Sequence, residues 1–143
     1  MKLKDVMSRS VESVDPESTL QDAAQKMRSM DVGALPVCQR DRLVGMITDR
    51  DITVRAVAQG EDPKQCCVSD AMTSELIYCF EDEDVEKAAK LMEEKQIRRL
   101  AVLDRNHRLC GMVSLGDLAT RQRDEHMSAE ILEQVSQPNQ PHA

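Results

Sequence analysis

Large aromatic residues are almost absent from this sequence of 143 residues, which has no tryptophan and only one tyrosine and one phenylalanine, Tyr78 and Phe80. A core must therefore be built from aliphatic side chains and nine methionines, whose flexible thioethers fill irregular spaces. Long apolar runs are also lacking. No stretch approaches the roughly 20 residues of a membrane span, and the first residues lack the apolar segment of a signal peptide. We therefore expect a cytoplasmic protein without a membrane partner.

The sequence also has fewer positively than negatively charged residues. The 26 acidic residues outnumber the 19 lysines and arginines, which gives a net charge of -7 and a pI near 5.0. Broad binding of nucleic acid requires a dominant basic field, so nucleic acid is not expected as the main partner. A few local arginines would still suffice to hold a small anion.

The spacings typical of a metal centre or a catalytic pair are missing too. The five cysteines form no C-x-x-C pair, and none of the three histidines stands at zinc-finger spacing or beside a nucleophile. Free thiols are the simplest interpretation, although the adjacent Cys66 and Cys67 leave a redox or soft-metal site open. The acidic run at residues 81–84 lacks a calcium-loop pattern and complements the positive end of a predicted helix. We expect that the protein binds no metal and is not an enzyme.

An internal repeat is the main feature that the chain does contain. Residues 45–52 (Gly-Met-Ile-Thr-Asp-Arg-Asp-Ile) recur in outline as residues 111–118 (Gly-Met-Val-Ser-Leu-Gly-Asp-Leu). Upstream of this motif a shift of 65 residues superimposes the two copies, pairing for example Met7 with Met72, whereas the motif itself needs a shift of 66. The extra residue falls in the polar segment 104–108. Because turns absorb insertions, this segment is predicted to be the turn of a hairpin.

Each repeat is predicted to follow the order β-α-β-β-α. In the first copy an extended piece at 11–14 precedes a capping box at 18–21, and apolar residues at helical spacing follow it. Two strands then flank a charged turn, at 34–38 and 43–47 in the first copy and at 100–103 and 109–113 in the second. A second helix begins at the hydroxyl residue of the motif. In the first copy Gly60 is expected to end it.

The predicted fold class is α+β, with two repeats related by a pseudo-twofold axis and packed as one module. We assign residues 3–60 to the first repeat, 61–67 to a linker, and 68–122 to the second repeat. The segments 2–7 and 68–72 are matching lead-ins. Residues 123–143 are expected to form a charged C-terminal helix and a disordered tail.

These motifs carry a resemblance to a known family. Met7 and the segments 20–24, 32–37 and 45–52, in this order, resemble a CBS (cystathionine-β-synthase) domain, and the second repeat resembles another. Together they resemble a stand-alone CBS pair, or Bateman module, with no catalytic domain attached. The resemblance implies a regulatory module that binds an adenosyl ligand in clefts between the repeats and works as a homodimer on an unidentified regulated protein. AMP is the first choice of ligand, with ATP, ADP, NAD and S-adenosylmethionine as further candidates.

The resemblance also implies which residues hold the ligand. The hydroxyl residue and the aspartate of one motif would contact ribose and phosphate, while the other repeat would present backbone to the adenine. One pocket would combine Thr48 and Asp51 with residues 76–78, which include Ile77 and Tyr78. The other would combine Ser114 and Asp117 with residues 10–12, which include Val11 and Glu12.

Chemistry supports these assignments. A carboxylate accepts two hydroxyl donors at once, so Asp51 or Asp117 suits a ribose diol. Arg98 and Arg99 match basic, phosphate-contacting positions of related modules, and Arg50 is a further candidate for neutralising charge. Because the first repeat has no arginine at the positions of Arg98 and Arg99, we expect a phosphorylated ligand first at Ser114 and Asp117.

Helix capping explains the same motif without any ligand. A hydroxyl residue followed three positions later by an acidic residue is what the start of a helix selects. A dimerisation or protein-interaction module with vestigial pockets is therefore one alternative function, and a thiol-based redox sensor using Cys66 and Cys67 is another.

Overall fold

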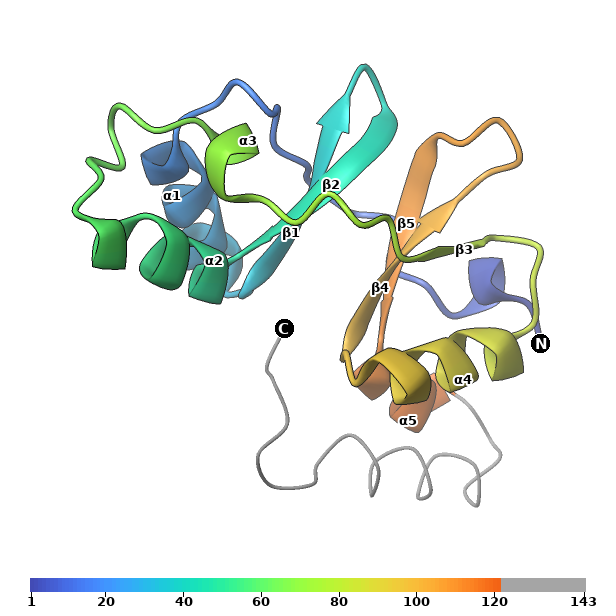
Figure 1. Cartoon of the computed structure of the whole chain (residues 1–143). Helices are drawn as coiled ribbons and strands as arrows, with labels where there is room; N and C mark the ends of the chain where they lie inside the picture. The colour runs from blue at the N-terminus through green and yellow to red at the C-terminus, as the bar shows by residue number, and fades with distance from the viewer. Residues whose placement is uncertain (122–143) are drawn as a thin grey trace. The chain divides into compact units, whose positions relative to one another are not determined.

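The computed structural model describes residues 1–121 and has the predicted α+β class (Figure 1). The described chain divides into two compact units. The central unit is the continuous segment Glu12–Leu76, and the terminal unit combines Met1–Val11 with the chain from Ile77 onward. The predicted C-terminal helix and tail lie outside the described residues, as do His126 and His142. Within residues 1–121 no helix is long and apolar enough to cross a membrane.

The central unit is built on an antiparallel hairpin of β1 (Ala34–Gln39) and β2 (Arg42–Thr48). Its helices are α1 (Leu20–Met30), α2 (Asp49–Arg55) and the short α3 (Val68–Ala71), with a 3-10 turn, η2, at Val57–Gln59. Gly60, at φ 78°, caps that turn, so the predicted stop is confirmed, although the regular helix ends earlier, at Arg55. The predicted strand at 11–14 is wrong, because only Val14 forms a bridge, to Val37.

The terminal unit repeats this plan with a complete additional strand. Its sheet has the order β3-β4-β5, in which β3 (Tyr78–Phe80) is parallel to β4 (Arg99–Leu103), and β4 is antiparallel to β5 (Leu109–Ser114). The helices are α4 (Val85–Lys95) and α5 (Leu115–Arg121), and a 3-10 turn, η1, occupies Leu3–Asp5. The predicted hairpin with its turn at 104–108 is confirmed. Both hairpins carry a register shift at equivalent places, between Val37 and Cys38 and between Val102 and Leu103.

The long helices α1 and α4 bury one apolar stripe each, as their spacing predicts. Leu20, Ala23 and Met27 of α1 are buried. The N-cap of α1 is Thr19 and not the first residue of the predicted capping box, because the Thr19 hydroxyl accepts a hydrogen bond from the backbone N–H of Asp22 (3.1 Å) while the N–H of Ser18 is engaged in the preceding turn. A residue in the left-handed region then ends each helix, as at many helix C-termini.

The lead-in of each repeat packs in the unit that contains the hairpin of the other repeat. Leu3, Val6 and Met7 belong to the core of the terminal unit, next to the α4 stripe. Val68 and Ala71 belong to the core of the central unit, and Met72 packs against it. The boundaries of the sequence repeats and of the compact units therefore differ. Because both lead-ins have the same apolar pattern, the sequence does not indicate which hairpin each one meets.

The first glycine of the repeated motif lies where a lead-in crosses the outer strand of the hairpin. At β2, Met46 and Thr73 exchange two backbone hydrogen bonds of 3.0 and 2.8 Å, and at β5, Met112 and Ser8 exchange two of 3.0 and 2.8 Å. A Cβ added to Gly45 would lie 2.7 Å from the carbonyl oxygen of Thr73, and one added to Gly111 would lie 2.8 Å from that of Ser8. The motif needs glycine here because two backbones approach too closely for a side chain.

Substituting either glycine by alanine should destabilise the protein. We expect Gly45→Ala and Gly111→Ala each to lower the free energy of unfolding by about 1–3 kcal/mol, because the methyl group forces backbone apart in a packed region. Urea denaturation measures this. Gly116→Ala is the matched control, since its methyl group would stand 3.5 Å from the nearest atom, the Ser114 hydroxyl oxygen. Equal stability of Gly111→Ala and the control would contradict the argument.

Candidate functional site

The hydroxyl residue and the aspartate of each motif form a reciprocal capping box. At the start of α2, the Thr48 N–H donates to Asp51 Oδ2 and the Asp51 N–H donates to Thr48 Oγ1, both at 3.0 Å. At the start of α5, the Ser114 N–H donates to Asp117 Oδ2 (2.9 Å) and the Asp117 N–H donates to Ser114 Oγ (3.0 Å). We call the first pair the central locus and the second pair the terminal locus. The predicted alternative, helix capping, is thus present at both.

Capping leaves part of each motif available. All four side chains are half-buried, and each hydroxyl group still has its proton to donate. At the central locus Asp51 Oδ1 lies 3.7 Å from the Nε of Arg55. At the terminal locus Asp117 Oδ1 has neither a hydrogen bond nor an ion pair with any described residue. The terminal aspartate therefore keeps the more available acceptor oxygen.

The terminal unit gathers most of the predicted site residues at one end of its sheet. Ser114 is the register partner of Arg99, and the Leu115 N–H donates to the carbonyl oxygen of Arg98 (2.8 Å). Tyr78 begins β3, which pairs with β4 starting opposite Ala101. Both arginines are exposed, and their guanidinium groups form no hydrogen bond, ion pair or ring contact with another residue of the described segment 1–121. Two cations thus flank the terminal locus.

Ile77 also belongs to the terminal unit, where it packs against the core. The central locus has a different surrounding. Ala34 is the register partner of Thr48, and the Asp49 N–H donates to the carbonyl oxygen of Gly33 (2.9 Å). Neither Gly33 nor Ala34 brings a charge. The cation closest in sequence is Arg50, which is exposed.

The two predicted pockets draw on both units. Val11 is half-buried in the terminal unit, whereas Glu12 is exposed at the start of the central unit. Leu76 ends the central unit. The predicted combinations of Thr48 and Asp51 with residues 76–78, and of Ser114 and Asp117 with residues 10–12, stay predictions.

Comparison with known proteins decides the family. A family model described as "CBS domain" matches residues 3–57 and again residues 68–124. The chain belongs to the CBS domain family. The two matches coincide with the two sequence repeats, so the predicted tandem CBS pair is confirmed. A relative from Bacillus subtilis (strain 168), "CBS domain-containing protein YhcV", is 42% identical over 137 residues, covering 96% of both chains.

Solved CBS structures share the fold over most of the chain. A structure of Hypoxic Response Protein I with two coordinated zinc ions has a TM-score of 0.78 and 38% identity, covering 84% of this chain and 98% of that one. The CBS domain pair of MJ0100, in complex with 5'-methylthioadenosine and S-adenosyl-L-methionine, has a TM-score of 0.74 and 27% identity, covering 85% and 94%. CBSX2 in complex with AMP has a TM-score of 0.72 and 26% identity, covering 84% and 94%.

The two large aromatics of this CBS pair form a cluster near the turn at 104–108, at the end of the β4–β5 hairpin opposite to Ser114, and sequence reasoning missed it. The rings of Tyr78 and Phe80 meet edge to face, with centroids 5.5 Å apart, and the His107 ring lies 5.4 Å from that of Phe80. The guanidinium carbon of Arg105 stands 4.2 Å above the Phe80 ring. The available signal was the i, i+2 spacing of Tyr78 and Phe80, which places both side chains on one face of a strand.

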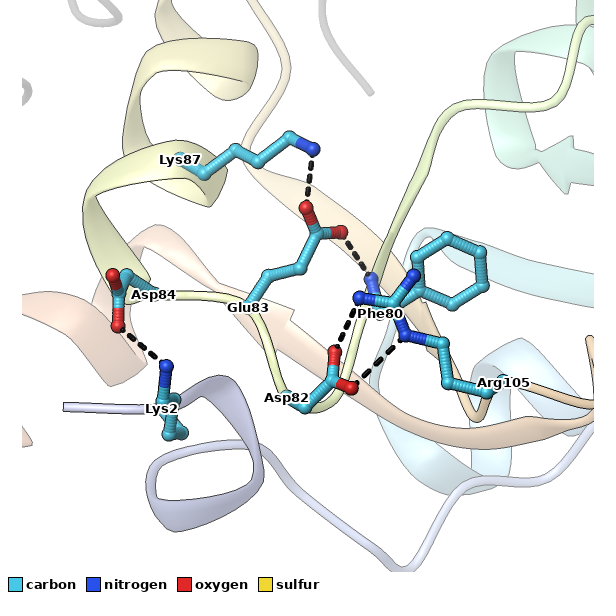
Figure 2. A network of polar contacts seen from close by, with 7 residues as sticks. All are labelled: Lys2, Phe80, Asp82, Glu83, Asp84, Lys87 and Arg105. Atoms are coloured by element: carbon cyan, nitrogen blue, oxygen red, sulfur yellow. Dashed lines mark hydrogen bonds and ion pairs between the residues drawn. The ribbon is translucent and has the colours of Figure 1, made fainter.

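The acidic run at 81–84 is engaged by basic side chains of the terminal unit (Figure 2). Arg105 donates two hydrogen bonds of 2.9 Å to Asp82, Lys87 pairs with Glu83, and Lys2 lies 3.2 Å from Asp84. Within residues 1–121 no group of three or more His, Cys, Asp or Glu side chains is placed to hold a metal ion. The run therefore anchors the start of α4 and the N-terminal lead-in.

This network should make stability depend on pH in one direction. The hydrogen bonds from Arg105 lower the pKa of Asp82. A carboxylate with a lowered folded-state pKa stabilises above its unfolded value, near 4, and loses that contribution as the pH falls through the folded value. Arg105→Gln should therefore unfold at lower urea concentration than the wild type at pH 7, and the difference should shrink toward pH 3.

Arg108→Gln is the control for this series, because it removes an arginine from the same turn without touching Asp82. The difference in stability between Arg105→Gln and the wild type could also be equally large at pH 3 and pH 7. That result would show that packing of Arg105 on Phe80, and not the ion pair, causes the loss of stability.

The five thiols of this CBS pair are all free. Burial raises the pKa of Cys79 to about 11, and burial together with nearby carboxylates raises that of Cys110 to about 11. At Cys66, partial burial and the carboxylate of Glu61 also raise the pKa of the thiol. Reactive cysteines need a lowered pKa, so the environment of Cys66 disfavours this thiol as a redox sensor.

Native-state labelling tests this conclusion. At pH 7.5 fewer than about one thiol in a thousand is ionised at a pKa near 11, so Cys79 and Cys110 should stay unmodified by iodoacetamide while the protein is folded. In urea all five cysteines should react, as mass spectrometry of peptides would report. Rapid and selective modification of Cys66 in the folded protein would instead support the hypothesis of a thiol-based sensor.

Proposed function

We propose that this CBS pair is a non-catalytic regulatory module that binds an adenosyl ligand, with AMP as the first candidate. The proposal places the ligand at the terminal locus, on Ser114 and Asp117, with Arg98 and Arg99 beside them. One observation carries it: two exposed arginines without side-chain partners in the described chain stand next to an aspartate with an unused oxygen. The complexes of CBSX2 with AMP and of MJ0100 with adenosyl compounds support the choice of ligand class.

Each part of a nucleotide has a suitable partner there. The unused oxygen of Asp117 would accept hydrogen bonds from the ribose hydroxyls, and the Ser114 hydroxyl would donate to a ribose or phosphate oxygen. Arginines favour phosphate because their planar groups donate two parallel hydrogen bonds. Backbone groups of residues 10–12, which include Val11 and Glu12, would contact the adenine edge. Ile77 and Tyr78 would have the same role for a ligand held by Thr48 and Asp51.

Regulation would follow from a difference in affinity between two states of the module. A ligand shifts an equilibrium only by as much as its binding free energy differs between the states. We propose that the readout is a homodimer whose conformation or affinity for a regulated protein changes on binding. An isologous twofold dimer is the commonest arrangement for such a chain.

A thermal melt with and without ligand tests the proposal. A ligand at 100 times its dissociation constant stabilises the folded protein by about 2.7 kcal/mol, so AMP, ADP, ATP, NAD, S-adenosylmethionine and 5'-methylthioadenosine are screened for a raised melting temperature. Asp117→Asn should abolish the shift with AMP, because an amide can still accept the capping hydrogen bond but suits a ribose diol poorly.

Asp70→Asn is the matched control. Asp70 Oδ2 accepts a hydrogen bond from the Cys67 N–H (3.0 Å) in a capping box at α3, outside both loci. This variant should lose similar capping energy and keep the ligand shift. If no compound raises the melting temperature of the wild type, adenosyl binding is refuted for this set.

Interaction without a ligand is the second candidate function. The reciprocal capping boxes satisfy both motifs by themselves, so the motif would persist in a module whose pockets are vestigial. A wild type that shows no ligand shift but forms a homodimer by light scattering would favour this function.

A further inference from the structure

Two segments of this chain share one sequence pattern and one way of docking. The first docking segment, residues 1–8, contains Leu-Lys-Asp-Val-Met-Ser, and the second, residues 66–73, contains Val-Ser-Asp-Ala-Met-Thr. In both, the aliphatic residues at the first and fourth of these six positions are buried, with an exposure of 1% or less. The aspartate at the third position accepts a hydrogen bond from the backbone N–H of the residue before the first position. The shared pattern is therefore aliphatic-x-Asp-aliphatic-Met-Ser/Thr.

The backbone hydrogen bonds of the two docking segments correspond one by one. Two N–H groups of each segment donate to carbonyl oxygens in the turn before a long helix, and the first residue of that helix donates back to the segment. The pairs, 2.7–3.0 Å apart, are Leu3–Glu83, Lys4–Glu81 and Val85–Met1 in the terminal unit, and Val68–Ser18, Ser69–Pro16 and Leu20–Cys66 in the central unit. The last residue of each pattern then exchanges two hydrogen bonds with the outer strand of a hairpin. Each unit thus presents the same kind of docking site.

The two docking segments differ in how the chain connects them to their sites. The second segment belongs to the same continuous stretch, Glu12–Leu76, as its docking site. The first segment is separated from its docking site, which lies beyond Ile77, by the whole central unit. Residues 9–13, which lead from the first segment into the central unit, form neither helix nor strand. The docked first segment and the rest of the terminal unit are therefore held to each other by noncovalent contacts.

From this arrangement we propose that the docking site of the terminal unit also accepts the first docking segment of a second copy of the chain. Two copies would exchange residues 1–8, and each terminal unit would keep its hydrogen bonds and its buried side chains. Exchange of an identical element between copies requires no new complementary surface. The inference goes beyond the proposed function, because it concerns how two copies join and requires no adenosyl ligand.

The docking site selects this segment by its apolar side chains. Leu3 and Val6 belong to the same core cluster as the buried stripe of α4, where a charged side chain would lose its hydration at high cost. The sulfur of Met7 would lie 2.6 Å from a Cβ placed on Gly111, so this methionine fills the space that the glycine leaves. A segment of another sequence would lose these contacts. The same segment from a second copy would keep all of them.

The effective concentration of the chain's own segment determines when exchange occurs. The closed and the exchanged forms have the same contacts at the docking site, so a second copy competes with the chain's own segment. For a short flexible linker the effective concentration is on the order of millimolar. At ~10 μM the wild type is therefore expected mainly in the closed form. Exchange should become the main form once pairing within one chain is blocked.

A pair of complementary full-length variants tests the proposal. Leu3→Asp has a defective segment and an intact docking site, because a carboxylate is disfavoured in the apolar core. Gly111→Val has an intact segment and a blocked docking site, because its side chain would meet the carbonyl oxygen of Ser8. Each variant alone should melt at a lower temperature than the wild type. In an equimolar mixture without ligand, a melting transition near that of the wild type should reappear, and native mass spectrometry should detect a 1:1 complex.

The double variant Leu3→Asp/Gly111→Val is the matched control. It has the same blocked docking site as Gly111→Val but no intact segment, so mixing it with Leu3→Asp should not restore the melting transition. Absence of recovery in the first mixture would refute exchange between copies. Equal recovery with the double variant would refute it as well, because the recovery would then not depend on the segment. Leu3→Ala takes the place of Leu3→Asp in these mixtures if the latter does not fold.

A fluorescent peptide of residues 1–9 tests docking in a second way. Leu3→Ala removes most of one buried side chain without adding charge, so its own segment should dock weakly while the unit stays folded. By fluorescence anisotropy the peptide should bind Leu3→Ala at least about tenfold more tightly than the wild type, whose own segment competes for the site. It should not bind Gly111→Val. Failure of the peptide to bind Leu3→Ala would show that the segment docks only within its own chain and would overturn the proposal.

Discussion

The close backbone contact at Gly45 and Gly111 is the constraint on which the rest of this structure depends. Each glycine lets a lead-in segment approach the outer strand of a hairpin closely enough for the neighbouring residues to exchange two backbone hydrogen bonds. The methionines Met72 and Met7 then cover the glycines with flexible side chains. This contact joins each lead-in to one hairpin by backbone hydrogen bonds, and the lead-in contributes apolar residues to the core of that unit. It also fixes the position of the strand that leads directly into the repeated motif.

The motif downstream of each glycine combines structural and proposed binding roles in the same atoms. Its hydroxyl residue and aspartate stabilise the start of a helix through two reciprocal hydrogen bonds, and each hydroxyl group keeps a proton to donate. The second carboxylate oxygen lies near Arg55 in the central motif and has no partner among the described residues in the terminal one. Because the same atoms can serve both roles, the sequence of the motif is compatible with a helix cap and with half of a ligand site. The flanking residues distinguish the two copies. Arginines stand beside one motif, and a carboxylate stands beside the other.

Much of this architecture was predictable because it depends on local sequence patterns. The apolar stripes of α1 and α4, the two hairpins and the tandem CBS pair all follow from periodicity, turn residues and the internal repeat. The strand expected at 11–14 fails because its pairing depends on a partner strand, and only Val14 meets one. The capping boxes were predicted from a three-residue spacing, which is short enough for sequence to define.

The sequence by itself determined the family, the two hairpins with their flanking long helices, and a set of candidate residues for binding. Only the tertiary structure decided which residues meet. Strand register places Arg98 and Arg99 beside the Ser114 motif, and packing sets the Asp49 carboxylate over Gly33. The rings of Tyr78, Phe80 and His107 come together in one cluster. Each lead-in packs in the unit that contains the hairpin of the other repeat. The physical reason is that side-chain patterns specify local conformation, whereas contacts between segments far apart depend on register and packing, which the two similar repeats leave ambiguous in sequence.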